Sequence, residues 1–105
     1  MRSFEKIRPQ RAQSNDGVAV YTRDRWAIRY ERPDRYCDLL CRPYLDENNK
    51  FDGLEIAMSG ALFELLCWHF QDGTKMVVTK VEKQEICDDV TAAYVVLGSH
   101  VHFVE

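Results

Sequence analysis

The stretch from Gly17 to Tyr30 constrains the fold more than any other segment, because residues alternate in it with the period of a β-strand. The alternating positions are Val18, Val20, Thr22, Trp26, Ile28 and Tyr30. A three-residue loop at 23–25 would set Val20 opposite Ile28. The sequence therefore predicts a hairpin whose six inward side chains, Trp26 included, belong to the core.

Two segments have the character of helices. Apolar residues at intervals of three and four predict a short helix over about 33–42, starting at Pro33. Residues 60–71 are rich in Leu and Ala, which predicts a second helix that Ser59 caps. Periodicity alone cannot assign a continuous apolar run, so a buried strand ending in an Asp72-Gly73 hairpin turn is the alternative for 60–71.

β-Branched and aromatic residues predict strands at 76–81, 91–97 and 100–104, with a short strand at 54–58. Gly98-Ser99 fits a tight hairpin turn between the last two strands, and 46–53 is rich in turn residues. Residues 1–16 are polar with little periodicity, which indicates an irregular or flexible arm.

These elements predict one α+β domain over residues 1–105, with an antiparallel sheet of about five strands and one or two helices packed on one face. A chain of 105 residues with 46% hydrophobic residues can bury a real core. No export signal and no apolar run of membrane-spanning length occurs in it. We therefore expect a soluble, cytoplasmic protein with no membrane partner.

Charge is divided unevenly along the chain. Residues 1–50 carry 11 Lys and Arg against 8 Asp and Glu, whereas residues 51–105 carry 3 against 9. All nine arginines lie at or before Arg42. Such a division can give one small domain a basic face and an acidic face, or it can be compositional drift.

The segment 21–36 interleaves arginines with aromatic residues, which are the side chains that dominate binding hot spots and stack on bases. The predicted hairpin leaves six of them exposed as candidate partner-binding residues: Tyr21, Arg23, Arg25, Arg29, Arg32 and Arg35. The alternative is a solvated face on which Asp24, Glu31 and Asp34 pair with the arginines.

Cysteines and histidines offer a weaker signal. Cys37 and Cys41 could join Cys67 and His69, or His100 and His102, in a tetrahedral zinc site. The spacing lacks a C-x2-C knuckle and coincides with apolar positions, so we expect reduced structural cysteines, Cys87 among them, with no metal and no cofactor. The two histidines share one face of the predicted strand, where only Glu105 supplies a nearby carboxylate.

No phosphate-binding glycine loop or nucleophile elbow occurs in the sequence, so we expect a protein that is not an enzyme. The expected function is protein binding, for instance as an inhibitor or immunity-type antagonist, and a homo-oligomer is compatible with it. The alternative is nucleic-acid binding through the same basic segment, against which stands the pI of about 5.6. A small metal- or cysteine-dependent enzyme is the third reading.

Overall fold

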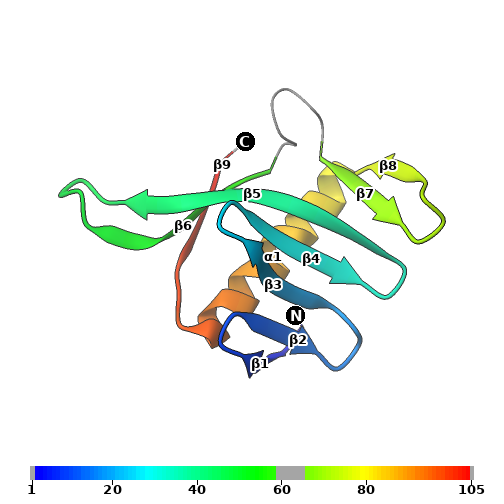
Figure 1. The fold of residues 1–105 in the computed structure, drawn as a ribbon, viewed down its shortest axis with the longest axis horizontal. Coiled ribbons are helices and arrows are strands. Elements are labelled where there is room, and N and C mark those ends of the chain that lie inside the picture. The colour runs from blue at the N-terminus through cyan, green and yellow to red at the C-terminus, as the bar shows by residue number, and fades with distance from the viewer. Residues whose placement is uncertain (1, 59–65, 105) are drawn as a thin grey trace.

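The computed structural model describes residues 2–58 and 66–104. These residues form a sheet of nine strands and one long helix, which crosses one face of the sheet (Figure 1). The elements are β1 (Phe4–Arg8), β2 (Arg11–Ser14), β3 (Ala19–Asp24), β4 (Ala27–Arg32), β5 (Arg35–Leu45), β6 (Phe51–Ala57), β7 (Cys67–Phe70), β8 (Lys75–Val77), α1 (Lys80–Leu97) and β9 (Val101–Val104). The α+β class is confirmed, but the sheet is larger than the five strands expected.

Strand order in the sheet is β1-β2-β3-β4-β5-β6-β9, with β7 pairing with β5 and β8 with β7. The pairs are antiparallel except that of β6 with β9, which is parallel. The eleven residues of β5 pair with β4 through Leu40, with β6 from Leu40 onward, and with β7 at Arg35 and Tyr36. β5 therefore pairs with three strands, and β7 and β8 branch from the sheet at the N-terminal end of β5.

β5 replaces the helix predicted over 33–42. Cys37, Leu39 and Cys41 are buried on the face toward α1, which is the alternation of a strand. Positions 37 and 41 share a face in a helix and in a strand alike, so their spacing did not distinguish the two. Pro33 and Asp34 form the turn between β4 and β5.

The hairpin of β3 and β4 is confirmed, but its register differs from the predicted one. Val20 lies opposite Tyr30 rather than Ile28, because Arg23 forms a bulge and the turn consists of Arg25 and Trp26. Ile28 and Tyr30 are fully buried, as predicted, whereas Trp26 is 57% exposed. The placement of Trp26 in the core was therefore wrong.

Residues 91–97, predicted to be a strand, belong to α1, and the strand predicted at 76–81 is present only as β8, Lys75–Val77. The helix begins with a capping box, in which the Thr79 hydroxyl accepts from the Glu82 N–H and the Glu82 carboxylate accepts from the Thr79 N–H. It ends at Gly98, whose φ of 84° makes it a left-handed cap rather than a hairpin turn. Capping and the burial of Ile86 and Val90 thus outweigh the β-branched composition.

The N-terminal residues are a hairpin, not an irregular arm: β1 pairs with β2, and Phe4, Ala12 and Ser14 are buried. The helix predicted at 60–71 lies partly outside the described residues, but 67–70 form β7, and β7 and β8 are joined by a turn at Gly73 with φ 88°. There the strand alternative is correct.

The core lies between α1 and the sheet, and its largest fully buried side chains include Trp68, Tyr30, Ile28 and Leu39. On the opposite face of the sheet, here called the outer face, no helix is present among the described residues. Its side chains include Tyr21, Arg29, Tyr36, Asp38, Leu40, Ala57 and His102. No helix in the described part of the chain is long and apolar enough to cross a membrane.

Candidate functional site

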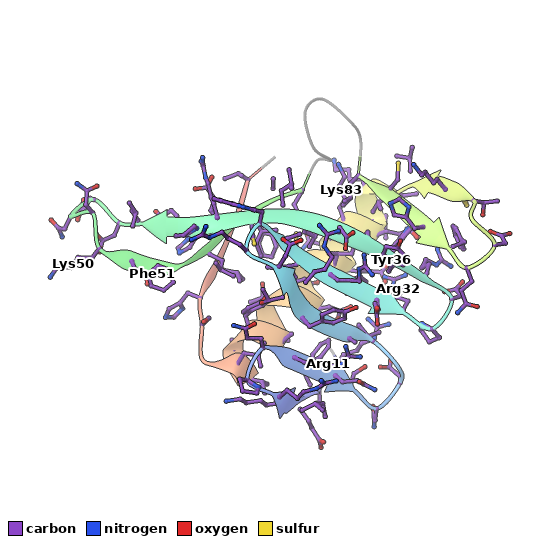
Figure 2. All side chains as sticks on the ribbon, in the orientation of Figure 1. Arg11, Arg32, Tyr36, Lys50, Phe51 and Lys83 are labelled. Atoms are coloured by element: carbon purple, nitrogen blue, oxygen red, sulfur yellow. The ribbon has the colours of Figure 1, made fainter. Side chains whose placement is uncertain are left out.

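The six predicted site residues divide between the two faces of the sheet. Tyr21, Arg23 and Arg29 extend from β3 and β4 on the outer face, and Arg25 lies in the turn. Arg32 and Arg35 lie on the core side, beside Trp68. Figure 2 shows Arg32 and Tyr36 on the neighbouring strands β4 and β5. The structure therefore does not bring the six residues together into one surface.

On the outer face, arginines are held by carboxylates of the same face. Arg29 donates two hydrogen bonds to the Asp38 carboxylate, at 2.8 and 3.1 Å, and Arg23 donates a third to it at 2.7 Å. The hydrogen bonds from Arg29 to Asp38 raise the pKa of the Arg29 guanidinium, which also lies 4.1 Å from the centre of the Tyr36 ring. A partner would have to break these contacts to use either arginine.

Tyr21 is similarly engaged. Its hydroxyl donates to the Glu31 carboxylate at 2.7 Å, and the Arg11 guanidinium lies 4.6 Å from its ring centre. Burial, and then the bond to Glu31, raise the pKa of Tyr21. This side chain therefore belongs to an internal network of the outer face.

On the core side, Arg32 and Arg35 lie against Trp68, with guanidinium carbons 4.9 and 5.3 Å from the ring centre. Arg32 pairs with Glu85 at 3.3 Å and Arg35 with Glu82 at 3.5 Å. Two arginines of the first half of the chain thus pair with two glutamates of α1, so at this place the basic and acidic halves of the chain lie side by side.

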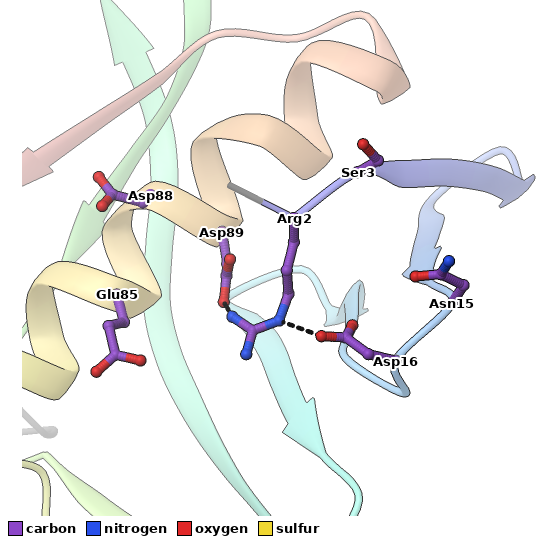
Figure 3. Close-up of a pocket in the computed structure, with 7 residues that line it drawn as sticks. All are labelled: Arg2, Ser3, Asn15, Asp16, Glu85, Asp88 and Asp89. Atoms are coloured by element: carbon purple, nitrogen blue, oxygen red, sulfur yellow. Dashed lines mark hydrogen bonds and ion pairs between the residues drawn. The ribbon is translucent and has the colours of Figure 1, made fainter.

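A hollow of about 760 Å³ lies between the N-terminal segment and α1 (Figure 3). Arg2 bridges its two sides, with Nε 2.9 Å from Asp16 and Nη1 2.7 Å from the buried Asp89. The Tyr30 hydroxyl also donates to Asp89, and burial followed by this bond raises the pKa of Tyr30. Arg2 and Tyr30 both donate to the buried Asp89 carboxylate, so the cluster holds the segment before β1, together with β4, against α1.

A second hollow, about 360 Å³, opens on the outer face and is mainly apolar. Its lining residues, which define the Trp26 groove, are Trp26, Leu40, Cys41, Arg42, Glu55, Ala57 and Val104. Trp26, Leu40 and Val104 are exposed, whereas Arg42 and Glu55 pair across the rim at 2.7 Å. Apolar surface beside a paired charge is the pattern of a protein-docking surface.

The turn that carries Trp26 is well supported. The Trp26 N–H donates to the Asp24 carboxylate at 2.9 Å, and the Trp26 carbonyl accepts from the Cys41 N–H at 2.9 Å. Arg25 stacks over the indole, with its guanidinium carbon 5.6 Å from the ring centre. The sequence signal that could have located this turn is Asp24, because an aspartate commonly accepts a hydrogen bond from the backbone two residues onward.

Histidines and cysteines form no candidate metal centre, since no group of three His, Cys, Asp or Glu side chains in the described ranges could hold an ion. His102 stacks on Tyr44 and lies 3.7 Å from the Asp52 carboxylate, a neighbour that the sequence did not suggest, while His100 precedes β9. The four cysteines form no disulfide among the described residues. Burial raises the pKa of the Cys37 thiol to about 12, as in a structural cysteine.

Neither a protein-family model, nor a curated protein, nor a solved structure matches this chain. The function proposed below therefore rests on the geometry of the chain itself.

Proposed function

We propose that this chain is a protein-interaction module that binds a partner protein in the Trp26 groove. The observation that carries the proposal is the exposed indole of Trp26 beside an apolar hollow on the outer face. Tryptophan is among the residues most enriched in binding hot spots, and burying a large aromatic ring gives much of the energy of an interface. A partner with an apolar side chain that fills the hollow fits this surface.

Two further observations support the proposal. The bonds to Asp24 and Cys41 hold the Trp26 backbone in the turn before any partner arrives, which lowers the entropy lost on binding. Arg25 forms no ion pair with any of the described residues, so its charge is available at the edge of the groove.

Of the six residues proposed from the sequence, Arg25 therefore keeps the strongest case for direct contact. Docking of this kind suits an inhibitor or immunity-type antagonist, which acts by occupying the surface of another protein. For nucleic-acid binding the geometry is less favourable, because Arg23, Arg29 and Arg32 already pair with carboxylates and the net charge is -3.

The test is comparative capture from native-host extract with three immobilised baits: the parent protein, Trp26→Ala and Phe51→Ala. Phe51 is an equally exposed aromatic residue, at 66%, and lies at the far end of the β5–β6 hairpin (Figure 2). We expect a protein that the parent and Phe51→Ala retain and that Trp26→Ala loses. Equal retention by all three baits, or equal loss by both variants, would contradict docking in the groove.

A second measurement separates the classes of partner. Repeating the capture across a range of salt concentrations, with an absorbance check for nucleic acid, distinguishes them. Binding through a packed apolar groove should depend weakly on salt. Nucleic acid in the eluate, with affinity that falls steeply and log-linearly with salt, would favour the alternative function.

A further inference from the structure

β9 forms one end of the sheet and pairs, among the described strands, with β6 alone. The N–H and C=O groups of successive residues in β9 point alternately toward β6 and away from it. On the side toward β6, the carbonyls of His100 and Val104 accept from the N–H groups of Leu54 and Met58, at 3.0 and 2.9 Å. In a parallel pair only every second residue bonds to a given neighbour. The N–H and C=O groups of Val101 and Phe103 therefore face away from β6.

The other sheet edges carry features that discourage pairing with a further strand. β1 has Lys6 and Arg8 with a register irregularity between them, and β8 has only three residues, one of them Lys75. Charged side chains, bulges and shortness are the usual protections of an edge. β9, with the sequence Val-His-Phe-Val, has no lysine, arginine, proline or bulge.

We propose that β9 pairs antiparallel with β9 of a second copy of this chain, which makes a two-fold dimer with a continuous sheet. A two-fold axis beside His102 sets Val101 opposite Phe103 of the second copy and Phe103 opposite its Val101. Both are hydrogen-bonded pairs of an antiparallel ladder. The N–H and C=O groups of Val101 and Phe103 in one copy therefore form hydrogen bonds with those of Phe103 and Val101 in the other.

The side chains of this edge also fit a second copy. β9 contains no Lys, Arg, Asp or Glu, so two β9 edges approach without the repulsion that the Lys and Arg side chains of two β1 edges would cause. Because the paired edge is only four residues long, the dimer is weak and depends on protein concentration.

The experiment is sedimentation velocity of the full chain over a wide concentration range. The parent protein should shift from monomer to dimer as the concentration rises. Val104→Lys should raise the dimer dissociation constant at least tenfold, because it places a charge on the paired edge. The matched control is Ile7→Lys, which makes the same kind of change at an exposed aliphatic residue of β1 and should leave dimerisation intact.

A second variant tests the backbone directly. Val101→Pro removes an N–H that faces away from β6 and keeps the bonds made by His100 and His102, so the β6–β9 pair should remain while the dimer is lost. Circular dichroism checks that both β9 variants fold.

Trp26→Ala should dimerise normally, so failure of the groove proposal and failure of the edge proposal can be distinguished. A parent protein that stays monomeric at every concentration, or a folded Val104→Lys variant that dimerises like the parent, would overturn the edge proposal. Loss of the dimer in Ile7→Lys alone would assign pairing to β1 and overturn it as well.

Discussion

Gly53 and His100 approach so closely that a methyl group at position 53 would lie 2.2 Å from the His100 carbonyl oxygen. The same oxygen accepts the hydrogen bond from the Leu54 N–H at 3.0 Å, at the start of the β6–β9 pair. Gly53 also has φ 86°, a conformation that side chains with a Cβ rarely adopt. The glycine thus determines where β9 can meet β6.

Gly53→Ala should therefore destabilise the protein by roughly 2–4 kcal/mol, from backbone strain and the displaced β9 strand together. Gly73→Ala is the control, because its φ is 88° but nothing lies within 4 Å of the added methyl group, and it should cost only about 1–2 kcal/mol. Urea unfolding curves measure both. Equal costs would show that the approach to His100 is not a constraint.

Trp26→Ala and Ile28→Ala test the hairpin register. Ile28 is fully buried and should cost roughly 2–5 kcal/mol on truncation, whereas the exposed Trp26 should cost about 1 kcal/mol. Thermal unfolding of the two variants gives the comparison. If Trp26→Ala were the more damaging change, the predicted three-residue loop at 23–25 would be the better description.

The triple variant Arg23→Glu, Arg25→Glu, Arg29→Glu should lower stability by roughly 1–3 kcal/mol, because two new carboxylates would face Asp38. Arg25→Glu alone should stay within about 0.5 kcal/mol of the parent. The sequence, taken alone, predicts that all three arginines are exposed, so that the triple change leaves the melting temperature within a few degrees of the parent and abolishes partner binding. Melting temperatures that are equal for the parent, the single variant and the triple variant would support that simpler prediction.

The capping box makes the free energy of unfolding depend on pH in the acidic range. The hydrogen bond from the Thr79 N–H lowers the pKa of Glu82 below its ordinary value of 4.5. A lowered folded-state pKa stabilises the fold above the unfolded-state value, and this stabilisation is lost as pH falls through the folded-state value. Glu82→Gln should therefore be less stable than the parent above about pH 5 and approach it in stronger acid. A stability difference that stays constant with pH would exclude this role.

The positions of several strands could be predicted from local sequence patterns. The alternation at 18–30 located β3 and β4, and the β-branched end of the chain located β9. Their register could not be predicted, because the turn at Arg25 and Trp26 together with the bulge at Arg23 shifts the pairing by two residues and exposes Trp26. The groove depends on that shift and on residues 40, 57 and 104, which only the tertiary fold brings together.

The helix was missed although its signal was present. Thr79-Lys80-Val81-Glu82 is a capping-box sequence, but the valines and the aromatic residue at 91–97 suggested a strand. Conversely, Cys37 and Cys41 fit a helix and proved to be strand residues, because Cys37 pairs with Tyr30 of β4 and Cys41 with Ile56 of β6, contacts that the local sequence does not reveal. In the first case helix capping outweighed the local residue propensity, and in the second case tertiary packing did.

The most direct measurement uses Trp26 as the reporter of its own burial. In a Trp68→Phe variant, which keeps an aromatic ring in the core, Trp26 is the remaining tryptophan. Its fluorescence should be quenched readily by acrylamide in the isolated protein, and should shift to the blue and become protected when the captured partner binds. Saturating partner that leaves the emission and the quenching of Trp26 unchanged would contradict docking in the Trp26 groove.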